Sequence, residues 1–246
     1  MKQYGIIVAI IFFISSNNIL GQNKTFKDDQ MRYERVRTAY KDKEKLVAGY
    51  FQNSDSKEIF IRVFKEEAEL EIWVRSKLGN IYRLLHSYII YYVCGNLGPK
   101  RQQGDNQVPE GFYYIDRFNP VSSFYLSLGI NYPNESDRIL GVKSNLGGDI
   151  FIHGSTVTIG CFPMTDDLIK EIYIICVEAR NAGQINIPVY IFPFKMTDEN
   201  INKHKNAYDD HINEFWNNLK EGYDYFESCK TIPRIYVDKN GKYIFK

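Results

Sequence analysis

Apolar and polar positions divide the chain into helical ends and a strand-rich middle. Between residues 24 and 51 apolar side chains recur with helical spacing, and within this stretch no glycine precedes Gly49, which predicts a helix packed on the main domain. Residues 197–229 carry an apolar stripe of the same period, so a second amphipathic helix is expected there. Short apolar stretches on either side of the Asn-Gly pair at 240–241 predict a closing hairpin.

Strand patterns begin near residue 58. Residues 58–64 and 70–75 alternate apolar with polar side chains, and a turn leads into a further run at 81–85, so successive antiparallel strands are predicted. Residues 88–94 are more uniformly apolar, which predicts a central strand that is buried on both faces.

Two segments rich in turn-forming residues interrupt the next strands. Residues 95–111 are crowded with glycine, proline and polar side chains, and we expect an exposed loop there and another at 131–137. Residues 112–115 and 124–128 are strand-like. A further short strand runs directly into His153, and the end of a strand is a good place for a fixed functional group.

A helix and a strand complete the middle of the chain. Thr165 is the predicted N-cap of the helix, with Asp166 and Asp167 in its first turn and an apolar face that ends near Gly183. Residues 187–194 form the strand, and their prolines place it towards an edge of the sheet. Together these patterns predict an α+β fold with a mainly antiparallel sheet.

His153 and Cys161 supply the candidate chemistry, an imidazole and a thiol on one short loop. A cysteine thiol is mostly protonated near neutral pH and needs a base or a positive local field to become a nucleophile. His153 is the candidate base. Cys161 also precedes the predicted helix start, whose unpaired N–H groups favour a thiolate. The alternative is a buried loop cysteine beside an unrelated histidine.

Composition narrows the range of partners. The 246 residues, 44% of them hydrophobic, are enough to bury a full core. With 31 basic and 30 acidic residues the formal charge is +1, so no broad field attracts polyanions and nucleic acid is not an expected partner. His204 and His211 lie two turns apart on a predicted helix, too far for a shared metal ion.

The N-terminus has the layout of a secretory signal peptide. Lys2 precedes an apolar run at residues 5–14, a polar stretch follows, and Gly21 supplies a small residue for cleavage. The apolar run is too short to span a bilayer comfortably. We therefore expect an exported protein of the periplasm or cell envelope, whose only membrane contact is this segment if it stays uncleaved.

Four cysteines in an exported chain would permit two disulfide bonds. Cys94 ends an apolar run and Cys176 falls on the apolar side of a predicted helix, so both are expected as small core residues. If Cys161 is a nucleophile, the remaining number is odd, and a bridge between Cys94 and Cys229 stays open.

The order of strand, His-Gly-Ser, short insert, Ile-Gly-Cys and helix resembles the YkuD-type L,D-transpeptidases, and most closely their YafK-like branch of murein enzymes. The resemblance extends from roughly residue 60 to residue 194. Several further segments match that branch, in the same order along the chain: 98–100, 104–105, 107–113, 131–134 and 161–166. Because several ordered motifs agree, they favour the functional interpretation of the His153 and Cys161 pair.

The resemblance implies a role for each residue of the loop. Cys161 would be the nucleophile and His153 the base that takes its proton. Gly154 would orient His153 through its backbone carbonyl. The backbone N–H of Cys161, with that of Gly160, would stabilise the oxyanion.

Further residues are predicted to hold the loop or the substrate. Ser155 and Thr158 are expected to hold the loop by hydrogen bonds, with simple turn chemistry as the alternative. Basic residues near the loop, Lys100, Arg101 and Arg138, are candidates for gripping a substrate carboxylate, although surface cations are usually just solvated. The substrate-binding set predicted from the resemblance is Ser155, Thr158, Lys100, Arg101 and Tyr113.

The implied division of the chain has four parts. These are a signal peptide at 1–21, a helical segment at 22–57, a YkuD-like L,D-transpeptidase catalytic domain at 58–194, and a helix and hairpin extension at 195–246. The resemblance implies that the catalytic sheet forms a sandwich or barrel-like unit between terminal helices. No metal or organic cofactor is implied, and a monomer is expected.

The implied reaction is acyl transfer in two steps. Cys161 would attack a carbonyl in a peptidoglycan stem peptide and form a thioester, which an amine then resolves. The commonest YkuD pattern has other residues at the positions of Ile159 and Pro163, and the insert between the histidine and the cysteine is shorter here. Both departures agree with the YafK-like branch, where water releases a murein-linked lipoprotein, so an L,D-hydrolase is the alternative.

Two further classes compete with this interpretation. NlpC/P60-like peptidases place the cysteine before the histidine, and sortases separate the two residues much further, so the order in this chain argues against both. A non-catalytic wall-binding module is the alternative from another class, because the same sheet and an aromatic groove could hold a glycopeptide without turning it over.

Overall fold

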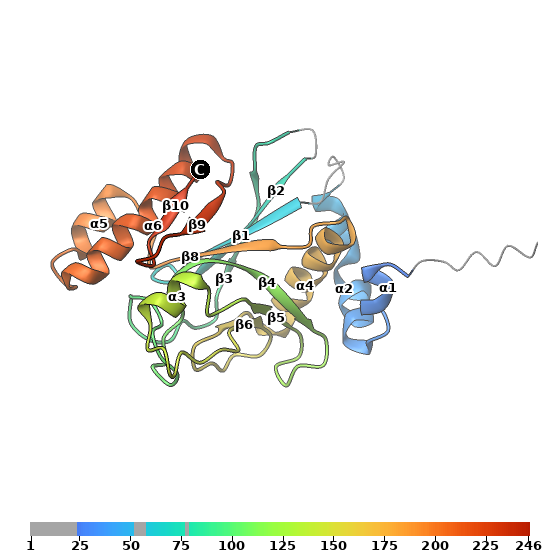
Figure 1. Ribbon diagram of the computed structural model, residues 1–246. Coiled ribbons are helices and arrows are strands. Elements are labelled where there is room, and N and C mark those ends of the chain that lie inside the picture. The colour runs from blue at the N-terminus through green and yellow to red at the C-terminus, as the bar shows by residue number, and fades with distance from the viewer. Residues whose placement is uncertain (1–23, 52–57, 77–78) are drawn as a thin grey trace, which may run out of the picture.

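A computed structural model describes residues 24–51, 58–76 and 79–246 (Figure 1). The expected signal peptide at 1–21 lies outside the described residues. In the part that is described, no helix is both long and apolar enough for a membrane span.

Ten strands and six helices form the described part. The strands are β1 Glu58–Phe64, β2 Glu69–Arg75, β3 Arg83–Ile89, β4 Gly111–Asn119, β5 Ser127–Ile130, β6 Phe151–His153, β7 Phe162–Pro163, β8 Ile187–Phe192, β9 Ile235–Val237 and β10 Tyr243–Phe245. The helices are α1 Phe26–Gln30, α2 Glu34–Tyr50, α3 Glu135–Leu140, α4 Thr165–Asn181, α5 Asp198–His204 and α6 Asp210–Cys229.

Eight strands pair in one curled sheet in the order β3-β2-β1-β8-β4-β5-β6-β7. All neighbours are antiparallel except β1 with β8 and β6 with β7. The predicted α+β class with a mainly antiparallel sheet is confirmed. The predicted C-terminal hairpin is confirmed too, as β9 pairs with β10.

The sheet separates two hydrophobic cores. The odd-numbered residues of β1, Ile59, Ile61 and Val63, pack with α2 and α4. Phe60 and Phe64 point to the other face and pack with α6 and the hairpin. Figure 1 shows α1, α2 and α4 on one side of the sheet and α5 and α6 on the other. Because side chains alternate between the faces of a strand, covering both faces buries nearly all of β1. Even Arg62 of β1 is buried, where it pairs with Glu71 at 2.7 Å.

The prediction of a central strand at 88–94 was wrong. The chain leaves the sheet after Ile89, and β3 is an edge strand with no neighbour beyond it. Ile89, Tyr91 and Tyr92 are exposed, and the backbone N–H of Tyr91 instead donates to the carbonyl of Pro163. A uniformly apolar run predicts burial on both faces, but the tertiary contacts leave three of these seven side chains exposed to water.

The expected edge position of the strand at 187–194 was also wrong, because β8 lies between β1 and β4. Pro188 has no N–H to donate. The pairing of β8 with β1 begins one residue later, at Val189, which lies opposite Ile61. The proline therefore lies just outside the parallel ladder, where it removes no hydrogen bond from it.

Helix boundaries differ from the sequence patterns in three places. The N-terminal helix breaks into α1 and α2, and Thr25 caps α1 by accepting from the backbone N–H of Asp28. The loop expected at 131–137 turns into α3, which Asn134 caps together with Asp137.

The single helix expected at 197–229 was also wrong. It divides into α5 and α6, which begin at the capping side chains of Thr197 and Asp209. All three differences involve short polar capping motifs, which periodicity alone does not register. The domain boundaries near 57 and 194 stay predictions.

A buried ion pair holds the segment that was expected to be an exposed loop at 95–111. Lys65, directly after β1, lies 2.8 Å from Glu110, and both side chains have 1% exposure or less. The Lys65 ammonium also donates to three loop carbonyls, those of Asn96, Gly98 and Val108. Glu110 in turn accepts from Trp216 Nε1 of α6 at 2.8 Å. The expectation of a wholly exposed loop was therefore wrong, because the ion pair pulls the loop into the core.

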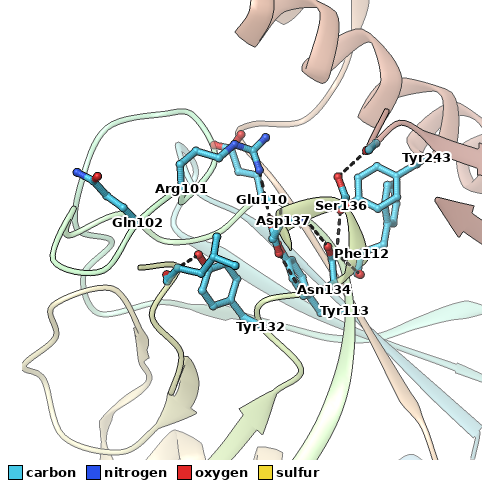
Figure 2. Close-up of polar contacts among 12 residues, drawn as sticks. Arg101, Gln102, Glu110, Phe112, Tyr113, Tyr132, Asn134, Ser136, Asp137 and Tyr243 are labelled. Carbon is cyan, nitrogen blue, oxygen red and sulfur yellow. Dashed lines mark hydrogen bonds and ion pairs between the residues drawn. The ribbon is translucent and has the colours of Figure 1, made fainter. Parts of the chain in front are cut away.

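A second buried carboxylate, Asp137, organises the far end of the same loop (Figure 2). It accepts from the Tyr113 hydroxyl at 2.9 Å and from the Asn134 backbone N–H at 3.1 Å, and it pairs with Arg101 at 3.3 Å. Burial raises the pKa of Asp137 to about 6, although hydrogen bonds to Asn134 and Tyr113 and the charge of Arg101 oppose the rise.

The helix that carries Asp137 also anchors the C-terminal hairpin. Asn134 Nδ2 donates to the Tyr243 hydroxyl at 2.8 Å, and the Ser136 hydroxyl donates to the Gly241 carbonyl at 2.6 Å. These contacts, visible in Figure 2, join α3 to β10 and to the hairpin turn.

Lys65→Met should destabilise the fold by about 3–5 kcal/mol, because it leaves the Glu110 carboxylate buried without its counter-charge. Urea denaturation measures the loss of unfolding free energy. Arg32→Met, which removes an exposed ion pair with Asp29, is the matched control and should change little. A loss below about 1 kcal/mol for the Lys65 variant would show that the pair does not hold the fold.

Asp137→Asn should change how stability depends on pH. The folded pKa of about 6 lies above the ordinary value of 3.8, so this carboxyl favours the fold below about pH 4 and that contribution is lost as the pH rises through 6. Relative to the parent, the variant should gain about 2 kcal/mol of unfolding free energy between pH 4 and pH 7.5, in addition to a pH-independent loss from altered hydrogen bonds. Urea denaturation at each pH tests this, and a pH-independent difference would contradict it.

Candidate functional site

His153 ends β6 and has only 1% of its surface exposed. The ring nitrogen Nδ1 lies 2.5 Å from the carbonyl oxygen of Gly154, and the Phe124 ring lies 4.7 Å from the imidazole, centre to centre. A carbonyl oxygen can only accept, so Nδ1 carries the proton and Nε2 is left as the basic nitrogen. The sequence interpretation of Gly154 as the residue that faces its carbonyl to the histidine agrees with this contact.

The His-Gly-Ser turn is packed too tightly for any side chain at its centre. A methyl group at Gly154 would lie 2.6 Å from Asp166 Oδ1 and 2.8 Å from the carbonyl oxygen of Phe124. Asp166 also accepts from the backbone N–H of Ser155 at 2.7 Å, and Ser155 has a φ of +64°. A carboxylate in the first turn of α4 therefore fixes the turn that holds His153.

Cys161 lies directly before β7, which pairs in parallel with β6. Ile152 is opposite Phe162 in this register, so alternation along the two strands points His153 and Cys161 to the same face, diagonally across the pair. In the described part of the chain, the hydrogen bonds of Sγ run to backbone groups, the Phe151 N–H at 3.4 Å and the Asp149 carbonyl at 3.6 Å. The Cys161 side chain is partly buried, and among the described residues its thiol makes no hydrogen bond with His153.

Burial favours the neutral form of both groups. Burial raises the pKa of the Cys161 thiol, and the nearby Cys94 and Asp149 raise it further, against a hydrogen bond from Phe151 and the charge of Lys100. Burial lowers the pKa of His153, and its hydrogen bond with Gly154 opposes the shift. A protonated thiol beside a neutral imidazole can become a nucleophile when the imidazole takes its proton.

A thiolate favoured by the helix N-terminus stays a prediction, and burial acts against it by raising the pKa of Cys161. The first turn of α4 uses its polar groups locally: Asp166 binds the Ser155 N–H, and the Leu168 N–H donates to the Thr165 hydroxyl at 3.5 Å. The predicted N-cap was wrong by one residue, because Met164 is the N-cap and Thr165 is the first residue of α4.

The backbone N–H groups of Gly160 and Cys161 converge on one atom. Both donate to the hydroxyl oxygen of Thr158, at 3.2 Å and 2.7 Å, and that hydroxyl donates to the Cys161 carbonyl at 3.0 Å. Gly160 has a φ of +136°, and a methyl group there would lie 3.2 Å from the Gln107 carbonyl oxygen. The loop at 95–111 therefore packs closely against the backbone next to the candidate nucleophile.

The predicted substrate-binding residues of the 95–113 segment have internal partners. Lys100 pairs with Asp105 at 2.5 Å, Arg101 pairs with Asp137, and Tyr113 is buried with its hydroxyl on the same aspartate. Arg138 is exposed. A contact between any of these side chains and a substrate stays a prediction.

Two residues that hold the His-Gly-Ser turn could not be recognised from the sequence. Phe124 lies against the His153 ring from the turn before β5, and no sequence pattern distinguishes it. Asp166 has the sequence pattern of a first-turn helix charge, but it binds the Ser155 N–H. The four cysteines, Cys94, Cys161, Cys176 and Cys229, are free thiols, so the Cys94–Cys229 bridge does not form. Within residues 24–51, 58–76 and 79–246 no cluster of three or more acidic, histidine or cysteine side chains could hold a metal ion.

Iodoacetamide at pH 7 should modify Cys229 before Cys161 and leave Cys176 unmodified in the folded chain. Cys229 is exposed. Burial alone would raise its pKa, but hydrogen bonds with Thr231 and Ser228 together outweigh that effect and lower it, whereas burial raises the pKa of Cys161 and Cys176. Peptide mass spectrometry over time measures the order, with Cys161→Ser and Cys229→Ser as assignment controls. If Cys161 were labelled faster than Cys229 at pH 6, the expectation that Cys161 and His153 are both neutral would be contradicted.

Comparisons with known proteins identify relatives of this chain. No protein-family model matches it. It is 41% identical, over 197 residues, to the protein named "Putative L,D-transpeptidase YafK" in Escherichia coli strain K12 and in strain O157:H7, and the match covers 79% of this chain and 76% of that protein.

Solved structures give weaker likenesses. The helical cell shape determining protein Pgp2 from Campylobacter jejuni is 17% identical with a TM-score of 0.44 and 80% of each chain covered. Bd1075 from Bdellovibrio bacteriovorus is 18% identical with a TM-score of 0.41, covering 76% of this chain and 80% of that one. The sequence identity with YafK spans about three-quarters of both proteins, and on that ground the chain belongs to the YafK-like branch of the YkuD-type L,D-transpeptidase family.

Proposed function

We propose that the chain is a cysteine-dependent L,D-transpeptidase that acts on peptidoglycan stem peptides in the cell envelope. Membership of the family supports a murein-modifying role. The observation that carries the finer proposal is the tautomer of His153: the Gly154 carbonyl takes up Nδ1 at 2.5 Å and leaves Nε2 as a base on the face to which Cys161 points.

The first step acylates the enzyme. His153 Nε2 takes the thiol proton as Cys161 Sγ attacks the carbonyl carbon of the diaminopimelate residue, and the carbonyl electron pair moves onto oxygen. Backbone N–H groups of Gly160 and Cys161 stabilise that oxyanion. When the carbonyl re-forms, the C–N bond breaks, and the departing D-alanine nitrogen receives the proton from His153. The product is a thioester on Cys161.

The second step returns the thiol. An amine of a second stem peptide, or of an envelope protein, attacks the thioester while His153 takes its proton, and the sulfur leaves and is reprotonated. No metal or organic cofactor enters either step. We place the protein outside the cytoplasm, acting as a monomer.

A hydrolase is the second candidate, because water can replace the amine in the second step. Ile159, where the commonest pattern of the wider family has a different residue, is 84% exposed, so the acyl group would form beside an open loop. The substrate of such a hydrolase would be a murein-linked lipoprotein or a cross-link.

Incubation of the chain from Gln22 onward with disaccharide tetrapeptide should give an acyl adduct on Cys161. Cys161→Ser should abolish the adduct, and His153→Gln should slow its formation at least about a hundredfold, because it removes the base. Cys229→Ser, which removes an exposed thiol, is the matched control and should acylate like the parent. Intact mass spectrometry measures the adduct.

Addition of an amine acceptor separates the candidate reactions. A cross-linked dimer supports the transpeptidase, and tripeptide or released lipoprotein supports the hydrolase. Binding of muropeptide with neither adduct nor product would instead indicate a non-catalytic wall-binding module, and the enzymatic proposal would have to be abandoned.

A further inference from the structure

The oxyanion donors of the proposed mechanism already hold an oxygen atom. The N–H groups of Gly160 and Cys161 both point at Thr158 Oγ1, 3.2 Å and 2.7 Å away. The hydroxyl proton is used as well, since it donates to the Cys161 carbonyl at 3.0 Å. Thr158 Oγ1 is therefore bonded to three backbone groups of its own loop.

This arrangement conflicts with catalysis unless Thr158 moves. The oxyanion forms on a carbon that is bonded to Cys161 Sγ, so it arises within reach of the N–H of the same residue. Oxyanion donors act only if they lie about 3 Å from the developing charge and are free to point at it. In the resting site, the shorter of the two hydrogen bonds, 2.7 Å, commits the Cys161 N–H to Thr158.

We propose that the Thr158 hydroxyl occupies the oxyanion site of the resting enzyme and that the substrate carbonyl oxygen displaces it. Thr158 is then an internal stand-in for the substrate and not a substrate-binding residue. This inference rests on the proposed acyl-transfer function, because it assigns the N–H groups of Gly160 and Cys161 to the oxyanion.

The two sides of the contact differ in their freedom to move. Gly160 is buried, and the Gln107 carbonyl closes the space next to its α-carbon. Thr158 lies between two exposed side chains, Val157 at 59% and Ile159 at 84%. The N–H donors are therefore fixed by packing, whereas the threonine side chain can rotate to another staggered position.

A second polar neighbour is available to the displaced hydroxyl. Burial raises the pKa of the Cys94 thiol, and a hydrogen bond with Thr158 opposes that rise, which places Cys94 next to the same side chain. The hydroxyl does not have to enter an apolar environment when it leaves the N–H groups. The cost of opening the site is the exchange of hydrogen bonds and not their loss.

Thr158→Val tests the displacement, because it keeps the branched shape and removes the oxygen. A stem-peptide aldehyde is the probe: it forms a thiohemiacetal with Cys161 whose oxygen needs the two N–H groups but which has no leaving group. Since a net hydrogen bond changes an equilibrium by a factor of about two to ten, the valine variant should bind the aldehyde about three- to tenfold more tightly and acylate faster. Thr158→Ser should stay within about twofold of the parent, because it retains the hydroxyl.

Val157→Ala is the matched control, since it alters the same loop at an exposed side chain outside the contact. Weaker aldehyde binding by the valine variant, with parent-like binding by the serine variant, would overturn the proposal and make Thr158 a positioning residue. Equal binding by all variants would overturn it too, because the Thr158 hydroxyl would then not compete with the aldehyde oxygen for the N–H groups. If the valine variant fails to fold, Thr158→Ala removes the same oxygen and decides: displacement predicts tighter aldehyde binding by the alanine variant, and positioning predicts weaker binding with a loss of kcat.

Adduct formation by the parent protein shows whether a negative result counts against the displacement of Thr158 or against the proposed acyl-transfer function. If the parent forms acyl and aldehyde adducts and the Thr158 variants behave alike, only the displacement is wrong. If the parent forms neither adduct, the acyl-transfer function fails and the inference fails with it.

Discussion

The buried ion pair between Lys65 and Glu110 is the constraint on which the arrangement of the site depends. Two charges at 1% exposure or less would be costly unless each were fully bonded, and the three loop carbonyls on Lys65 and the Trp216 indole on Glu110 supply those bonds. The pair thereby joins the end of β1, the loop at 95–111 and α6. Without it, a seventeen-residue loop rich in glycine and polar groups would have little reason to pack.

That loop reaches the candidate nucleophile through its backbone. The Gln107 carbonyl lies against Gly160, where even a methyl group would meet it at 3.2 Å, and Lys100 contributes a positive charge near the Cys161 thiol. From the other side, Asp166 and the Phe124 carbonyl close around Gly154. The two glycines of the site are thus needed for close approach by different elements, and the histidine and the cysteine are each held by a turn that tolerates no side chain.

The sequence predicted the local chemistry better than the long-range packing. His153 at a strand end, the helix after Cys161 and the Gly154 contact depend on residues near one another in the chain, so their order was informative. The pair of Lys65 and Glu110 could not be predicted, because nothing in the sequence brings together two residues 45 positions apart. The same limit explains the exposed run after Ile89 and the central place of β8, since both depend on which strands become neighbours.

The neutral state of the site follows from the same packing. Burial disfavours both the thiolate of Cys161 and the imidazolium of His153, so their ion pair would be costly where no substrate shields it. The N–H groups that would offset a negative charge are bonded to Thr158 instead. Under the proposed function, activation would require the substrate to do two things at once, bringing its carbonyl to the thiol and its oxygen to the N–H groups. The proposed mechanism would thereby protect the thiol from alkylation and oxidation until a stem peptide arrives, because those reactions need the thiolate.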